Sequence, residues 1–60
     1  SYYKVVAHKL VYGETAQSVT ESYGLEYSKV LNMMKLVNGK DSFDMIYAGT
    51  VLYVPVSCKA

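Results

Sequence analysis

The chain has 60 residues, of which 52% are hydrophobic, and its six basic and five acidic side chains leave a net charge of +1. A chain this short has room for one hydrophobic core, and its apolar share exceeds that of disordered proteins, so we expect a single folded domain over residues 1–60. Its basic residues are scattered lysines with no Arg among them, which argues against a nucleic-acid partner because phosphate binding needs a clustered basic face.

The sequence also argues against membrane insertion and metal binding. Its apolar runs, such as residues 5–7 and 45–48, are far shorter than the roughly 20 residues of a membrane-spanning helix. Cys58 is the only cysteine and His8 the only histidine, so neither an internal disulfide nor a structural zinc site is expected. We therefore expect no cofactor and a modest stability of about a few kcal/mol.

In chain order, the first predicted elements are a strand and a short helix. Residues 3–11 are rich in Val and Tyr and contain neither Gly nor Pro, which is typical of a β-strand that ends at residues 12–14. Thr15 is a suitable N-cap for a helix, and Gly24 a suitable stop. One face of this helix is formed by apolar side chains at helical spacing: Ala16, Val19 and Tyr23.

A second, longer helix and a second strand follow. Ser28 is the predicted N-cap of the helix, and Asn38-Gly39 ends it. Its core face is Tyr27, Val30, Leu31, Met34 and Val37. Residues 40–44 form a polar loop, and the β-branched and aromatic residues 50–54 predict a strand bounded by Pro55.

This order of elements predicts an α+β fold. Two strands alone are marginal in water, so they must pair with each other and pack against both helices. The long helical connection permits either pairing direction, and we favour an antiparallel pair with both helices on one face of the sheet.

Two motifs in this order resemble those of the LysM domain family. Residues 13–24, GETAQSVTESYG, resemble the family pattern G-D-T-L-x-x-I-A-x-x-Y-G, with Glu14 in place of Asp. Residues 44–55, DMIYAGTVLYVP, are similar to D-L-I-Y-P-G-Q-x-L-x-I-P, and Asn38-Gly39 resembles the family's N-G element. The resemblance covers about residues 8–55, with residues 1–7 as an N-terminal strand extension and residues 56–60 as a tail. It implies a βααβ fold.

The chain departs from the family pattern at three places. His8 stands where the family has the Tyr of a Y-x-V element, or else Tyr3-Lys4-Val5 is that element and residues 6–10 are inserted. The second helix is longer by about one α-helical turn. Ala48 replaces a Pro, which removes a fixed φ from the loop before the last strand. Because the last two departures lie near the expected groove, we expect them to alter affinity more than fold.

The resemblance implies a shallow ligand groove between two loops. On one side lie Gly13, Glu14, Thr15 and Ala16, and on the other lie Asp44, Met45, Ile46, Tyr47 and Ala48. Backbone amides and a small apolar wall are sufficient to recognise an acetamido group. We favour helix capping as the main role of Thr15, core packing for Ile46 and a loop anchor for Phe43. For Tyr47, stacking on a sugar and ordinary packing both stay open.

The implied function is non-catalytic binding of N-acetylglucosamine polymers, either peptidoglycan or chitin, outside the cell or in the cell wall, by a module tethered to other domains or repeats. An enzyme would need an acid–base set, and Glu14, Asp44 and His8 are the only candidates. Each has a structural explanation instead: a helix N-terminus for Glu14, a turn for Asp44 and a mid-strand position for His8.

An alternative function is that of a structural or protein-interaction module. LysM-like folds also serve as adaptors in spore coats and phage-type tail baseplates, and the longer second helix adds surface that sugar binding does not require. Under this alternative, a protein partner would bind an apolar patch around Met33 and Leu36, which flank the core face of the second helix.

Overall fold

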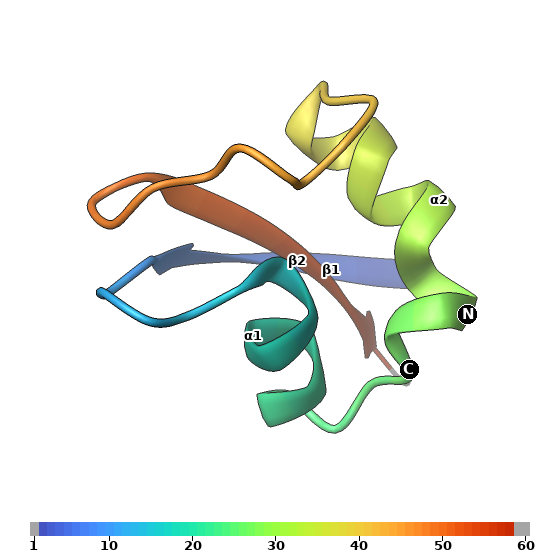
Figure 1. Ribbon diagram of the computed structural model, residues 1–60. Coiled ribbons are helices and arrows are strands. Elements are labelled where there is room, and N and C mark those ends of the chain that lie inside the picture. The colour runs from blue at the N-terminus through green and yellow to red at the C-terminus, as the bar shows by residue number, and fades with distance from the viewer. Residues whose placement is uncertain (1, 59–60) are drawn as a thin grey trace.

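The computed structural model describes residues 2–58, including the side chains of residues 4–56. Its elements are β1 (Tyr2–Lys9), α1 (Ala16–Ser22), α2 (Tyr27–Asn38) and β2 (Val51–Cys58) (Figure 1). The two strands form an antiparallel sheet with the two helices between them in sequence. The predicted α+β class, the order of elements and the antiparallel pairing are therefore confirmed.

The strand pairing is longer than predicted and has no interruption. It runs from Tyr2 opposite Cys58 to Lys9 opposite Val51, so the two ends of the chain lie at the same end of the sheet (Figure 1). Every pair keeps one register, so residues 6–10 are not a bulged insertion. Residues 56–58, expected to belong to a tail, continue β2 and pair with the N-terminal extension.

The prediction that the last strand ends at Pro55 is wrong. The Leu10 N–H donates to the Thr50 C=O at 2.8 Å, and hydrogen-bonded and non-hydrogen-bonded pairs alternate from there along an antiparallel ladder. Pro55 lies opposite Val5, which makes this a non-hydrogen-bonded pair. The N–H that proline lacks would have pointed away from β1, so Pro55 interrupts no bond of the sheet.

The core lies between the helices and one face of the sheet. One buried cluster is formed by side chains of both helices, of β2 and of the residue that follows β1: Leu10, Ala16, Val19, Met34, Leu52 and Val54. Val6 and His8 lie on the same face of the sheet, since they pair directly with Val54 and Leu52. On the opposite face Val5 and Tyr53 are exposed. Pro55, which pairs with Val5 on this second face, is nevertheless fully buried. Packing against the helices stabilises a sheet of only two strands.

The boundaries of α1 agree with the capping prediction, whereas the start of α2 does not. Thr15 is the N-cap of α1, and Gly24 follows the helix with a φ of 80°. In α2, however, the helix begins before Ser28, and the N-cap is Glu26, without a side-chain bond. Tyr27 packs against the core cluster and takes a helical conformation, which places Ser28 inside the first turn rather than before it.

Candidate functional site

The two loops that carry the predicted site residues meet at the end of the sheet opposite the termini (Figure 1). The Gly49 N–H donates to the Leu10 C=O at 2.8 Å, and the Leu10 N–H donates to the Thr50 C=O at the same distance. These bonds tie the start of the β1–α1 loop to the end of the α2–β2 loop. Gly13 on one loop and Tyr47 on the other are thus held in one region of the surface.

The predicted site residues divide into exposed and buried sets. Gly13, Asp44, Met45, Tyr47 and Ala48 are exposed, with 71% of Met45 and 64% of Tyr47 accessible to solvent. Ala16 is buried in the core, and Ile46 and Phe43 pack against it, as their apolar character favoured. The side chain of Ala16 is therefore not available to a ligand. Ile46 anchors the α2–β2 loop by packing against the core.

Thr15 caps α1. Its hydroxyl accepts from the Ser18 N–H at 3.0 Å, and the Ser18 hydroxyl oxygen accepts from the Thr15 N–H at 2.9 Å. This reciprocal pair satisfies two backbone donors at the helix start. The capping role is confirmed, and it engages the hydroxyl that a sugar would otherwise bind.

Tyr47 begins a tight turn at the end of the α2–β2 loop. The Thr50 N–H donates to the Tyr47 C=O at 3.1 Å, and Gly49 has a φ of 90°, which together indicate a type II turn. The Tyr47 ring projects from this turn with most of its surface exposed. Core packing is thus excluded as the role of Tyr47, and its ring is accessible for stacking.

Ala48 occupies the second position of this turn, where proline is favoured. We expect Ala48→Pro to raise the free energy of unfolding by about 0.4–1 kcal/mol, because proline restricts the unfolded chain. No hydrogen bond from the Ala48 N–H is found among the described residues, so none would be lost. Urea denaturation measures the change, with Ala48→Ser as the control for altered side-chain chemistry. A lower stability of the proline variant would contradict the type II geometry.

A polar cluster joins β1 to the β1–α1 loop and to the end of α1. His8 Nε2 lies 3.0 Å from a carboxylate oxygen of Glu14, and His8 Nδ1 lies 3.2 Å from the Tyr23 hydroxyl. The same carboxylate accepts from the Val11 N–H at 2.8 Å. Donation from Nε2 to the carboxylate leaves Nδ1 of a neutral imidazole to accept from Tyr23. Sequence spacing contains no signal for this cluster, because its members come from three segments that only the fold brings together.

This cluster corrects the predicted environment of Glu14. We expected the dipole of α1 to stabilise its carboxylate, but the carboxylate turns back toward β1. The Val11 N–H, and after it the hydrogen bond with His8, holds the pKa of Glu14 below its ordinary value of 4.5. Of the three candidate acid–base residues, the fold thus joins Glu14 to His8. Asp44 lies near Tyr27 instead, where burial and then the charge of Asp44 raise the pKa of the Tyr27 hydroxyl.

The lowered pKa of Glu14 predicts a stability that depends on pH. The folded state binds the Glu14 proton less tightly than the unfolded chain, so the ionised carboxylate stabilises the fold at neutral pH. This contribution is lost as the pH falls below about 4.5 and through the folded-state pKa. We expect Glu14→Gln to flatten the decline of the thermal midpoint between about pH 5 and pH 3. Parallel profiles for Glu14→Gln and the wild type would contradict this prediction, and Glu21→Gln on α1 is the matched control.

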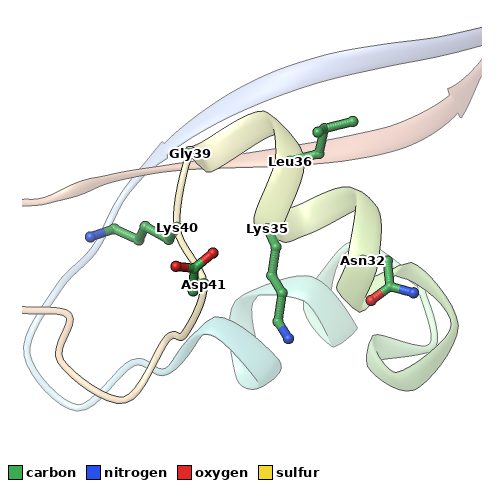
Figure 2. A pocket seen from close by; sticks show the side chains of 6 residues that line it. All are labelled: Asn32, Lys35, Leu36, Gly39, Lys40 and Asp41. Carbon is green, nitrogen blue, oxygen red and sulfur yellow. The ribbon is translucent and has the colours of Figure 1, made fainter.

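A shallow hollow of about 330 Å³ lies elsewhere on the surface, beside the C-terminal half of α2. It is lined by Asn32, Lys35, Leu36, Gly39, Lys40 and Asp41. Figure 2 shows that these side chains diverge, with Lys35 and Leu36 on different sides of the helix. The hollow includes none of the predicted groove residues. It does include Leu36, which is 75% exposed and belongs to the patch predicted for a protein partner.

In the described part of the chain, no three His, Cys, Asp or Glu side chains gather in a way that could hold a metal ion. Neither helix of residues 2–58 is long and apolar enough to cross a membrane. Comparison with protein families, curated proteins and solved structures found no match to this chain. The resemblance to LysM domains accordingly rests on the two sequence motifs and their order.

Proposed function

We propose that this protein is a non-catalytic carbohydrate-binding module for N-acetylglucosamine polymers, either peptidoglycan or chitin, in the cell wall or outside the cell. One observation carries the proposal: the two loops with the LysM-like motifs are hydrogen-bonded to each other at one end of the sheet. Their exposed residues, among them Gly13, Met45 and Tyr47, provide a surface on which an extended sugar chain can lie.

The chemistry of this surface suits an uncharged, N-acetylated sugar. The Tyr47 ring offers an apolar plane for a pyranose face, and the Met45 side chain offers a contact for the acetyl methyl group. Backbone amides of the exposed loop can bind the acetamido group. Such a surface binds weakly, with Kd values of about micromolar to millimolar, and attachment to other domains or repeats strengthens binding by avidity. Because the ligand is neutral, affinity is nearly independent of salt.

The proposal is non-catalytic because two of the three candidate acid–base groups, Glu14 and His8, are bonded to each other within the fold. The Glu14 carboxylate accepts from His8 and from a backbone N–H, and Asp44 lies near Tyr27. Glycoside hydrolysis needs two carboxyl groups that flank one bond, with one of them free to donate a proton. The bonds of Glu14 favour its ionised form, which is the opposite of what a general acid requires.

An amide-shift titration of the labelled domain with N-acetylglucosamine oligomers of increasing length tests the proposal. We expect saturable shifts in residues 13–16 and 44–48 that strengthen with oligomer length. Tyr47→Ala removes the stacking plane and should weaken binding by about 2- to 12-fold. Leu36→Ala is the matched control, since Leu36 is as exposed but lies on α2. No amide movement at millimolar oligomer would contradict the carbohydrate-binding function.

A second candidate function is that of a protein-interaction adaptor, favoured by the exposure of Leu36 beside the hollow on α2. Contiguous exposed apolar patches mark protein-docking surfaces, and Leu36 is the exposed member of the patch predicted around Met33 and Leu36. Variants at Tyr47 and at Leu36 distinguish the two functions. If Tyr47→Ala preserves biological activity while Leu36→Lys abolishes it, the adaptor function replaces carbohydrate binding.

A further inference from the structure

The two edges of the sheet differ in whether they can accept another strand. On β2, the backbone of Tyr53 faces outward, and the side chain of Asn38 binds it twice. Asn38 Nδ2 donates to the Tyr53 C=O at 2.8 Å, and the Tyr53 N–H donates to Asn38 Oδ1 at 2.8 Å. Two residues further on, Pro55 has no N–H to offer. An amide side chain and a proline therefore block the outer edge of β2.

The outer edge of β1 is open. Because Leu10 and Thr50 are hydrogen-bonded, the alternation of pairs directs the N–H and C=O groups of Val5, Ala7 and Lys9 away from β2. None of these groups has a hydrogen-bond partner within residues 2–58. The side chains of these three residues at the edge are also exposed. This edge is a ready template for an additional strand.

The charge of β1 indicates what kind of strand fits. The strand carries Lys4, His8 and Lys9 and no acidic residue. Among the described side chains the ion pairs are His8–Glu14 and Lys29–Glu26, which leave Lys4 and Lys9 without a carboxylate. A second copy of β1 would bring its own Lys4 and Lys9 to the same seam and would not neutralise these charges. Edge lysines of this kind oppose self-pairing.

We propose that the β1 edge binds an extended peptide segment of a partner protein, with acidic side chains opposite Lys4 and Lys9. The segment adds as a third, antiparallel strand and exchanges backbone hydrogen bonds with Val5, Ala7 and Lys9. Between its acidic residues it carries β-branched residues, which pack beside the exposed side chains of Val5 and Ala7. This interaction surface is separate from the loop surface proposed for sugar, and it does not depend on that function.

A blocked hexapeptide, Glu-Thr-Val-Thr-Val-Glu, tests the proposal as a probe that pairs from Lys9 to Lys4. We expect it to shift the amide signals of Val5, Ala7 and Lys9 in the labelled domain and to slow their hydrogen exchange. Replacing both of its Glu residues with Lys should weaken binding by roughly 2- to 30-fold at low ionic strength. The Lys4→Gln, Lys9→Gln double variant should remove this difference between the two peptides.

N-methylation of the peptide provides the matched control and leaves the protein unchanged. Methyl groups on the two Val nitrogens block the bonds to Val5 and Ala7 and should abolish binding, whereas methyl groups on the two Thr nitrogens face solvent and should preserve it. Equal effects of the two modifications would overturn the proposal, as would the absence of shifts at millimolar peptide. Concentration-dependent shifts at the same amides without peptide would also overturn it, in favour of a second copy as the occupant.

Discussion

Met34→Ala is expected to lower the free energy of unfolding by about 2–5 kcal/mol. The Met34 side chain is fully buried, and it lies in the one cluster that joins α1, α2 and β2. Its sulfur also lies 3.8 Å from the Thr20 hydroxyl, whose proton is donated to the Ala16 C=O at 2.7 Å. Truncation removes apolar contacts and leaves a cavity that neighbouring side chains fill only in part.

This loss is large relative to the total stability of the domain, because the domain is small. At about 0.05–0.15 kcal/mol per residue, 60 residues have a total stability of about 3–9 kcal/mol. The Met34→Ala variant should therefore lose a large share of its total stability and unfold at a much lower urea concentration than the wild type, as measured by circular dichroism. Met34→Leu, which nearly conserves volume, should cost less than about 1.5 kcal/mol. Leu36→Ala, at an exposed position of the same helix, should change stability by less than about 0.5 kcal/mol. A Met34→Ala variant as stable as Leu36→Ala would contradict the assigned core.

Substitution of Asn38 is expected to detach the end of α2 from β2. In addition to its two bonds with Tyr53, Asn38 Nδ2 donates to the Met34 C=O at 2.8 Å. Asn38→Ala leaves the outward N–H and C=O of Tyr53 without protein partners, and we expect a loss of about 1–3 kcal/mol. Asn38→Asp keeps an acceptor for the N–H but places a carboxylate against two carbonyl oxygens, so it should cost at least as much.

Amide hydrogen exchange distinguishes the loss of the Asn38 bonds from a general loss of stability. The Tyr53 amide should exchange faster in Asn38→Ala, while the Leu52 and Val54 amides, which face β1, should change only with global stability. Asn32→Ala, at an exposed position on α2, is the control for loss of an amide side chain. If the Tyr53 amide stays as protected as in the wild type, the Asn38 bonds do not hold this edge.

Local sequence signals predicted the elements that depend on neighbouring residues. Thr15 was predicted to cap α1 and does so, because a cap bonds only to residues two or three positions ahead. Asn38-Gly39 was predicted to end α2, and Gly39 has the positive φ that ends it. The 3.6-residue period placed Val19 and Met34 in the core, and both are buried. It was wrong for Tyr23, which is 40% exposed, and it did not predict the full burial of Thr20.

The wrong predictions concern residues whose environment is set by distant parts of the chain. Ser28 is a good cap by residue type, but packing of Tyr27 on the core started the helix earlier. Proline usually ends a strand, but the register with β1 places Pro55 in a non-hydrogen-bonded pair, where its missing N–H costs no bond of the sheet. The predicted groove residue Ala16 is in the core, because α1 turns that side of its first turn toward the sheet.

By itself, the sequence determined the elements, their order, the cap of α1 and the two motifs on which the proposed carbohydrate binding rests. These features follow from backbone propensity and periodicity, which act over a few residues. Only the tertiary structure decided that His8, Glu14 and Tyr23 form one cluster, and that Asn38 closes one edge of the sheet while the edge of β1 stays open. Hydrogen bonds between segments 15 residues apart depend on the register and the twist of the sheet, and no local pattern encodes either.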